Sequence, residues 1–339
     1  MQTLPTINLS DFIADPLGPR GSRVVKAILA ACHSPGFCYV SGHEVDAKLE
    51  ADLMAAAKQF FALPEAQRHA LAIANSPHFR GYTILGDERT KGISDWRDQL
   101  DIGPEEPAPA PNKNNPPWLN LRGPNQWPAR LPQLQTATLA WMAAMEPLGL
   151  VVMRALALGL GQQIDYFDGA MLPRGDTHIK IIRYPAQEQE RDTGQGVGLH
   201  HDSGLLTFIL QDDVGGLEVH ADGTVISANH VPGCYVMNLG EMLQSATHGY
   251  LRATKHRVES PPPGRERISI AFFAHPRLEA TFEPIELPRE LAAVARGGQN
   301  SDANDPVYAR FGENCLKIRL RAHPDVARAH YHDIVAAEN

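Results

Sequence analysis

The stretch His200-His201-Asp202-Ser203-Gly204-Leu205-Leu206-Thr207 decides how this chain is interpreted. Alternate residues of an extended strand point to the same face, so the side chains of His200 and Asp202 can reach one metal ion. The residues that follow, through Leu210, are apolar and prone to form a strand. The segment therefore predicts a histidine and a carboxylate presented together at one end of a β-strand.

The His-x-Asp pattern occurs three times, so its surroundings must show which copy binds a metal. The copy in 220–223 ends in Asp-Gly and is typical of a hairpin turn. In the copy at 323–325 the central proline marks the start of a helix, where an acid interacts well with the helix dipole. His256 lies far enough beyond Asp202 to return on a neighbouring strand. Two imidazoles and one carboxylate, from His200, Asp202 and His256, form the ligand set of non-haem Fe(II) oxygenases.

A second alternating pair, Arg267 and Ser269, lies in an apolar run that ends at Ala274. A guanidinium beside a hydroxyl is suited to binding a carboxylate in bidentate fashion, and a buried arginine needs an anion. A surface salt bridge is the alternative, which the apolar run disfavours. Phe273 shares the predicted face of this pair, so it packs either against a substrate ring or in the core.

The run from His178 to Tyr184 predicts a further strand. If Tyr184 faces the pocket, it is placed to donate a hydrogen bond to a co-substrate carboxylate. Lys180 would then share its face and meet an acidic or phenolic substrate. The alternative for Lys180 is a strand-end lysine whose amine reaches water.

Composition narrows the class of partner. The 339 residues carry a formal net charge of −8, and no run of Lys or Arg occurs, so we expect no nucleic-acid or membrane partner and a small-molecule substrate instead. The N-terminus lacks the basic and apolar segments of an export signal, so we expect a cytoplasmic protein. Four scattered cysteines, without CxxC spacing, predict buried free thiols. The sequence does not predict the oligomeric state.

The pattern of apolar residues predicts a mainly β protein with flanking helices. Helical spacing in 24–31 and 49–63 and a strand-like run in 37–40 indicate a mixed α/β region over residues 1–128. Bracing helices follow in 129–175, with a long helix over 131–160 that is expected to pack in the core. Residues 176–285 carry many short strands separated by turns, which favours a sandwich or jelly roll. Residues 286–339 form a C-terminal extension, with a polar segment over 297–305 that we expect to be mobile and a closing helix over 324–334.

These motifs together resemble the 2-oxoglutarate- and Fe(II)-dependent dioxygenase superfamily, in its isopenicillin N synthase-like branch. The resemblance extends over nearly the whole chain. It is carried by residues 4–9, 36–43, 60–64, 80–82 and 95–98 near the start, and by 200–207, 211–219, 238–241, 256–258 and 267–269 in the core.

The resemblance implies a double-stranded β-helix in which His200, Asp202 and His256 hold Fe(II). It also implies that 2-oxoglutarate chelates the metal, that Arg267 and Ser269 bind its distal carboxylate, and that O₂ takes the remaining position. Decarboxylation of 2-oxoglutarate would then be coupled to hydroxylation, desaturation or cyclisation of a small molecule.

The sequence departs from the branch at several positions. His201 stands where Thr is usual, Glu241 where Asp is usual, and residues 182–185 differ from the Asn-Tyr-Tyr-Pro of plant members. That last segment is closer to isopenicillin N synthase, an Fe(II) oxidase that uses no 2-oxoglutarate and whose Arg-x-Ser binds the substrate. Such an oxidase is therefore one alternative function, and a small-molecule binding protein without turnover is another.

Overall fold

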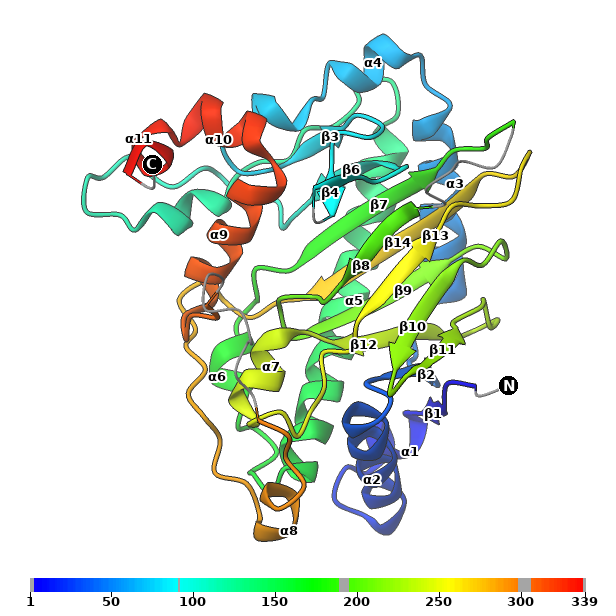
Figure 1. Cartoon of the computed structure of the whole chain (residues 1–339), viewed down its shortest axis with the longest axis vertical. Coiled ribbons are helices and arrows are strands. Elements are labelled where there is room, and N and C mark those ends of the chain that lie inside the picture. The colour runs from blue at the N-terminus through cyan, green and yellow to red at the C-terminus, as the bar shows by residue number, and fades with distance from the viewer. Residues whose placement is uncertain (1–2, 91, 189–194, 298–305, 338–339) are drawn as a thin grey trace.

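The computed structural model describes residues 3–90, 92–188, 195–297 and 306–337. Two β-sheets face each other, and helices cover the outer face of the larger one (Figure 1). This is the jelly-roll arrangement expected from the sequence. The small sheet remains open at its two outer strands, so the sheets do not close into a continuous barrel.

Eight strands of the described residues form the large sheet. In sheet order they are β1 (Thr6–Asn8), β2 (Phe37–Ser41), β12 (Tyr235–Leu239), β9 (Leu206–Gln211), β14 (Arg267–Ala274), β7 (His178–Tyr184), β6 (Asp98–Ile102) and β3 (Gly81–Thr83). Four of them come from the first 128 residues, so the N-terminal region completes the same sheet as the segment 176–285. The division of the chain at residue 128 remains a prediction.

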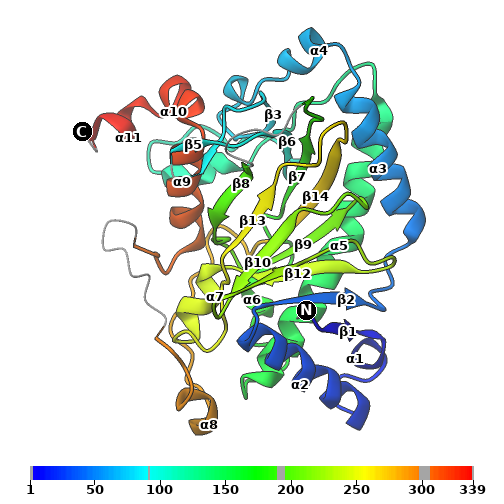
Figure 2. The same ribbon diagram turned by 45° about the vertical axis from the view of Figure 1, so that its right-hand side comes forward.

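The small sheet supplies the opposite wall. Its order is β11 (Thr224–Ser227), β10 (Leu217–Ala221), β13 (His256–Glu259) and β8 (Gln195–His200). A short hairpin of β4 (Arg89–Thr90) and β5 (Ile93–Ser94) packs beside β8 (Figure 2). It is anchored there by the Asp95 carboxylate, which accepts a hydrogen bond from the Gly198 backbone amide.

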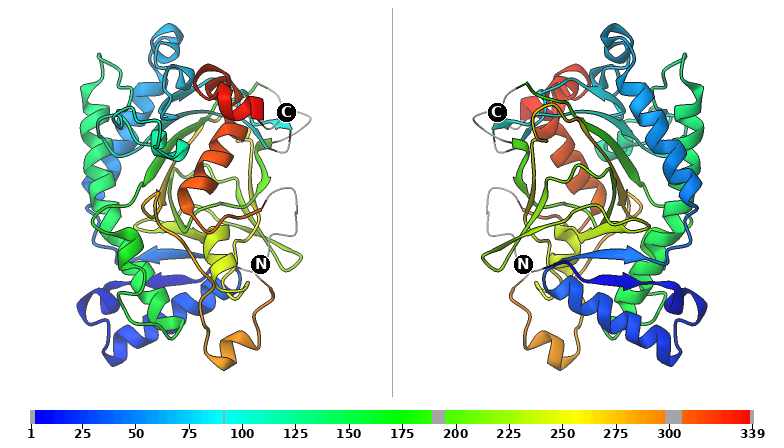
Figure 3. Two further views of the ribbon diagram at one scale, coloured as in Figure 1. Left: turned by 90° about the vertical axis from the view of Figure 1, so that its left-hand side faces the viewer. Right: turned by 90° about the vertical axis from the view of Figure 1, so that its right-hand side faces the viewer.

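The helices lie mainly outside the large sheet. They are α1 (Ser10–Ala14), α2 (Pro19–His33), α3 (Ala47–Phe61), α4 (Glu65–His69), α5 (Pro132–Gly159), α6 (Asp168–Met171), α7 (Glu241–Ala246), α8 (Arg289–Ala292), α9 (Phe311–Ala322), α10 (Pro324–His330) and α11 (His332–Ala337), with 3₁₀ turns η1 (Ile73–Asn75) and η2 (Pro117–Leu121). Figure 3 shows α3 and α5 along the outer face of the large sheet, where both contact β14.

Helix α5 confirms the predicted long core helix. Its length and apolar composition would suit a membrane span, but half of its most apolar window is buried inside the protein. Trp141, Met145 and Val152 have no exposed surface. They belong to the larger hydrophobic core, between the helices and the large sheet. A smaller core of inward-facing residues lies between the two sheets.

The strand expected over 37–40 forms as Phe37–Ser41, and the strand expected over His178–Tyr184 agrees at both ends. Strand β8 and helix α9 were not predicted, and β13 was expected only as the neighbouring strand on which His256 returns, without bounds. The closing helix expected over 324–334 is divided into α10 and α11. The polar segment 297–305 was expected to be mobile; all but its first residue lies outside the described part of the chain. The four cysteines are free, as expected, although Cys234 and Cys315 are only partly buried.

Candidate metal centre

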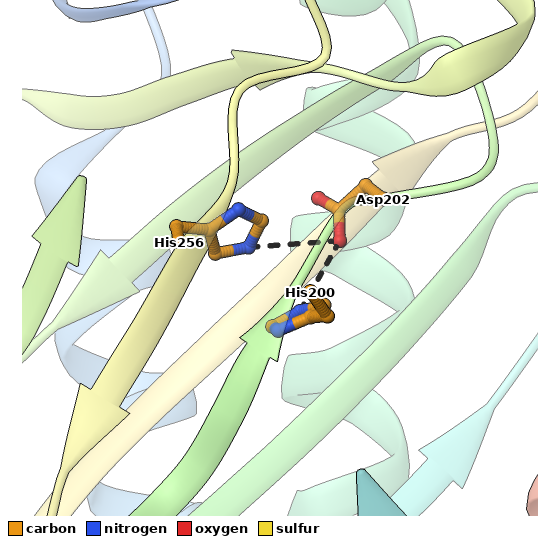
Figure 4. A group of neighbouring side chains, drawn as sticks. All are labelled: His200, Asp202 and His256. Carbon is orange, nitrogen blue, oxygen red and sulfur yellow. Dashed lines mark ion pairs between the residues drawn. The ribbon is translucent and has the colours of Figure 1, made fainter. Parts of the chain in front are cut away.

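The three predicted ligands meet at the mouth of the space between the sheets (Figure 4). His200 ends β8 and His256 begins β13, and the two residues are direct partners in the antiparallel ladder. Asp202 lies just beyond β8, where a backbone bridge ties it to Gly240. The site therefore joins one edge of the small sheet to the end of β12 in the large sheet.

The ligand atoms converge on one point. The Nε2 atoms of His200 and His256 each lie 3.7 Å from Oδ1 of Asp202, and the three ligand atoms are all within 4.8 Å of one another. Both Nδ1 atoms face backbone carbonyls, that of Gly198 at 2.8 Å for His200 and that of Thr254 at 3.2 Å for His256. Such contacts place the proton on Nδ1 and leave the Nε2 lone pair for a metal.

The Asp202 carboxylate is oriented by hydrogen bonds to its other oxygen. Oδ2 accepts from the Thr207 hydroxyl at 2.5 Å and from the Asn238 amide at 2.7 Å, which leaves Oδ1 directed toward the histidines. Gly240 permits the backbone that follows Asp202 to approach the end of β12, because a Cβ there would lie 2.2 Å from the carbonyl oxygen of Gly204. Thr207 and Asn238 were not recognised in the sequence as parts of the site, although both lie on apolar strands at inward-facing positions.

Electrostatics keep the ligands in the protonation states that a metal requires. Burial, followed by the neighbouring His256, lowers the pKa of His200 to about 3. Burial alone would raise the pKa of Asp202, but the two imidazoles and the two hydrogen bonds lower it. At neutral pH the site therefore offers at least one neutral imidazole and one carboxylate. Two nitrogens and one oxygen on one side of a point are the donor set of non-haem Fe(II), so the residues fit this metal.

Arg267 and Ser269 lie deeper between the sheets, on the inner face of β14. The Arg267 side chain is 1% exposed, and its guanidinium donates to the Ser269 hydroxyl at 3.1 Å and to the Gln211 amide oxygen at 2.8 Å. Both partners are neutral, and Nε has no hydrogen-bond partner among the described residues. A buried cation held only by neutral groups is an unmatched charge, which favours an anionic ligand at this place.

The structure also places the remaining predicted residues. The Tyr184 ring lies 4.8 Å from the Arg267 guanidinium carbon, beside the proposed anion site. Lys180 shares the inner face of β7, but its amine pairs with Glu88 at 3.0 Å, so it does not reach water in the way that the strand-end alternative supposed. Phe273 is partly buried, with its ring 5.9 Å from the ring of His178. Their roles toward a substrate remain predictions.

A group of buried charged residues lies next to the triad and was not predicted as a site. We call it the ion-pair cluster; its members are Glu88, Arg97, Gln99, Asp101, His178, Lys180 and Arg319. They come from the segment before β4, from β6 and its approach, from β7 and from α9. Arg97 is close enough to His200 to contribute to the lowering of its pKa.

Comparison with known proteins agrees with this fold and site. Residues 4–130 match the family described as non-haem dioxygenase in morphine synthesis N-terminal, and residues 176–276 match the 2OG-Fe(II) oxygenase superfamily. The 2-oxoglutarate-dependent dioxygenase frbJ of Dothideomycetidae sp. is 33% identical over 306 residues, which cover 86% of this chain and 82% of that protein. A homoarginine-6-hydroxylase of Oryza sativa subsp. japonica is 32% identical over 274 residues, covering 79% and 82%.

The fold is also similar to that of a solved structure. The crystal structure of JOX2 in complex with 2OG, Fe and JA has a TM-score of 0.72 and 26% identity, and the match covers 94% of this chain and 85% of that one. The fold and the His-Asp-His site define a non-haem iron oxygenase. The chain belongs to the 2OG-Fe(II) oxygenase superfamily. It is a 2-oxoglutarate-dependent dioxygenase that acts on a small molecule.

Proposed function

We propose that His200, Asp202 and His256 bind Fe(II) and that Arg267 and Ser269 bind the distal carboxylate of 2-oxoglutarate. The observation that carries the second assignment is the buried Arg267 guanidinium, whose hydrogen-bond partners are both neutral. A carboxylate is the group that a guanidinium and an adjacent hydroxyl bind best. When bound, the iron supplies O₂ activation coupled to decarboxylation of 2-oxoglutarate.

Each part of the chain then has a defined task. The triad fixes the metal, while Thr207 and Asn238 hold the Asp202 carboxylate so that one oxygen faces it. Tyr184 packs its ring against the Arg267 guanidinium and limits the directions in which that group can turn. The apolar residues of the inner core exclude water from the space around the anchor.

The reaction on the substrate is proposed to be hydroxylation, with desaturation or cyclisation as other outcomes of the same oxidation. Several similar proteins have names that support a small substrate. The rice relative is named for homoarginine, and the JOX2 structure contains JA. Nothing in the comparisons favours an oxidase that works without 2-oxoglutarate.

An anaerobic titration of the metal-free protein tests the proposal. Fe(II) followed by 2-oxoglutarate should produce a visible charge-transfer band that saturates at one equivalent of each. The Asp202→Ala variant should give no band, whereas Asp222→Ala should retain it, because Asp222 lies in the hairpin-turn copy of the same motif. Iron binding without a band in the unmodified protein would overturn the co-substrate assignment and favour the oxidase.

A further inference from the structure

The ion-pair cluster contains both signs of charge in close contact. The Glu88 carboxylate lies 3.0 Å from the Lys180 amine and 3.2 Å from the Arg97 guanidinium. Asp101 accepts from Arg319 at 2.9 Å and faces Nε2 of His178 at 2.8 Å. The side chains of Glu88, Arg97 and Lys180 are only 10–14% exposed. Burial of so many charges costs free energy that a purely structural role seldom repays.

The carboxylates of the cluster are ionised. Burial alone would raise the pKa of Glu88, but Arg97 and Lys180 lower it to about 2. Burial would likewise raise the pKa of Asp101, but Lys180, His178 and Arg319 hold it well below its usual value. Burial, followed by the charge of Arg319, lowers the pKa of His178, so this ring is neutral at pH 7.

The charges that are ion-paired within the cluster sum to zero. The cations are Arg97, Lys180 and Arg319, and the carboxylates that pair with them are Glu88, Asp95 and Asp101. Three positive charges thus balance three negative ones. A ligand with a net charge would leave an uncompensated charge in a buried place.

The cluster contains both a hydrogen-bond donor and a hydrogen-bond acceptor that have no partner among the described residues. Within the described residues, Nε of Arg97 is a buried donor without a partner. Oε1 of Gln99 is a buried acceptor in the same condition. Buried polar atoms are nearly always paired in native proteins, so these two indicate a missing ligand. A ligand that offers only acceptors or only donors would satisfy one side and leave the other unpaired.

The cluster lies where a substrate of this enzyme would be oxidised. Lys180 is the ladder partner of Ala271, which shares the inner face of β14 with Arg267 and Ser269. Arg97 pairs with Asp95 at 3.3 Å, and the Asp95 carboxylate accepts a hydrogen bond from the backbone amide of Gly198, two residues before His200. Figure 2 shows β6 and α9 near β8, the strand whose last residue is His200. A small cavity lined by Arg80, His178 and Arg319 has a volume of about 10 Å³, which is room for about one water molecule.

We propose that the substrate is a zwitterionic amino acid of zero net charge, held by the ion-pair cluster with its carboxylate toward Arg97 and Lys180 and its ammonium group toward Glu88 and Gln99. This inference rests on the proposed function and adds the substrate class. The unused donor of Arg97 and the unused acceptor of Gln99 select a molecule with both kinds of group, and the balanced charge selects one whose charges cancel.

A panel of matched ligands tests the proposal on the unmodified enzyme loaded anaerobically with Fe(II) and 2-oxoglutarate. The panel holds the neutral protein amino acids, the monocarboxylates that lack their amino group, and the amines that lack their carboxylate. Two further compounds are controls for charge: lysine is an amino acid with a net charge of +1, and hydantoin is a ureide without charged groups. At least one zwitterion should perturb the charge-transfer band and, once O₂ is admitted, stimulate succinate formation at least tenfold more than its two singly charged analogues.

Two results would overturn the substrate class. One is a panel in which no zwitterion changes the band, and the other is a monocarboxylate, amine, lysine or hydantoin that acts as well as the best zwitterion. Either result leaves the proposed function intact, because the band itself reports iron and 2-oxoglutarate. Absence of the band in the ligand-free enzyme would instead contradict the proposed function.

Variants then locate the ligand. Lys180→Met and Glu88→Gln should each raise the zwitterion KM at least tenfold, while the 2-oxoglutarate KM changes less than twofold. Lys26→Met is the matched control, since Lys26 is exposed on α2 away from the cluster. If a single variant does not fold, the double variant Lys180→Met/Glu88→Gln removes one charge of each sign and keeps the balance. An unchanged zwitterion KM in a folded variant would refute the assigned contacts.

Discussion

The two sides of the metal centre are built in different ways. On one side, the ligands and Arg267 come from short motifs on β8, β13 and β14, and the groups that orient them are neutral or backbone. On the other side, the ion-pair cluster is assembled from segments as far apart as Asp101 and Arg319, which are 218 positions apart in sequence. The first side contains the metal ligands and the proposed 2-oxoglutarate anchor, and the second contains the groups proposed to select the substrate.

The difference shows that the groups that bind iron and 2-oxoglutarate can be separate from the groups that select the substrate, even within one pocket. A change on the metal side should affect every substrate, whereas a change in the cluster should affect some substrates and spare iron and 2-oxoglutarate. Three predictions, from the largest effect to the smallest, can break or sharpen this contrast.

Removal of a ligand gives the largest effect. His256→Ala should abolish turnover with little loss of fold, because a three-ligand site loses its geometry when one ligand goes. Metal content, activity and circular dichroism are the measurements. His220→Ala, in the hairpin-turn copy of the motif, is the control and should retain iron. Full activity of the His256 variant at normal iron would exclude this residue from the site.

Loss of the anchor comes next. Arg267→Ala should raise the 2-oxoglutarate KM about 100-fold, since removal of one partner of a buried charge pair costs roughly 2–5 kcal/mol. Succinate release at varied 2-oxoglutarate concentration measures it. Arg265→Ala is the matched control, because Arg265 lies two residues earlier with a half-exposed side chain. Equal KM values in the two variants would show that the distal carboxylate of 2-oxoglutarate is not bound by Arg267.

Loss of an orienting group gives the smallest of the three effects. Asn238→Ala removes one hydrogen bond to Asp202 and should weaken Fe(II) binding about tenfold, the lower end of the range for groups that orient ligands. Gln99→Ala truncates another buried amide, but in the ion-pair cluster, and should leave iron affinity unchanged. Competition with a chelator gives both values. If Gln99→Ala weakened iron as much as Asn238→Ala, the two sides would not be separable.

The metal side could be predicted from sequence because its signals are local. His200 and Asp202 stand two positions apart, Arg267 and Ser269 likewise, and each pair lies beside an apolar run. The predicted faces also proved right: Arg267 is buried and Ser269 lies beside it. His256 was chosen because it lies far enough beyond Asp202 to return on a neighbouring strand, and the resemblance to a known family supports that choice.

The ion-pair cluster could not be predicted from the sequence, and the reason is physical. Taken singly, Glu88, Arg97 and Arg319 are charged residues in polar contexts, which sequence patterns assign to the surface. Their burial follows from α9 and the β4–β5 hairpin folding against the sheets, and neither element carries a strong signal. The bounds of strand β13 were not predicted for a related reason, since its four residues include three that can ionise.

The direct pairing of His200 with His256 across the β8–β13 ladder has a consequence for how this centre tolerates change. A slip of one residue in that ladder would turn one imidazole to the opposite face and destroy the site, so iron affinity is a sensitive measure of strand register. The chain between the two histidines, by contrast, can lengthen or shorten in its turns without moving either ligand. Insertions in surface turns should therefore leave the metal centre intact, whereas errors in strand pairing should destroy it.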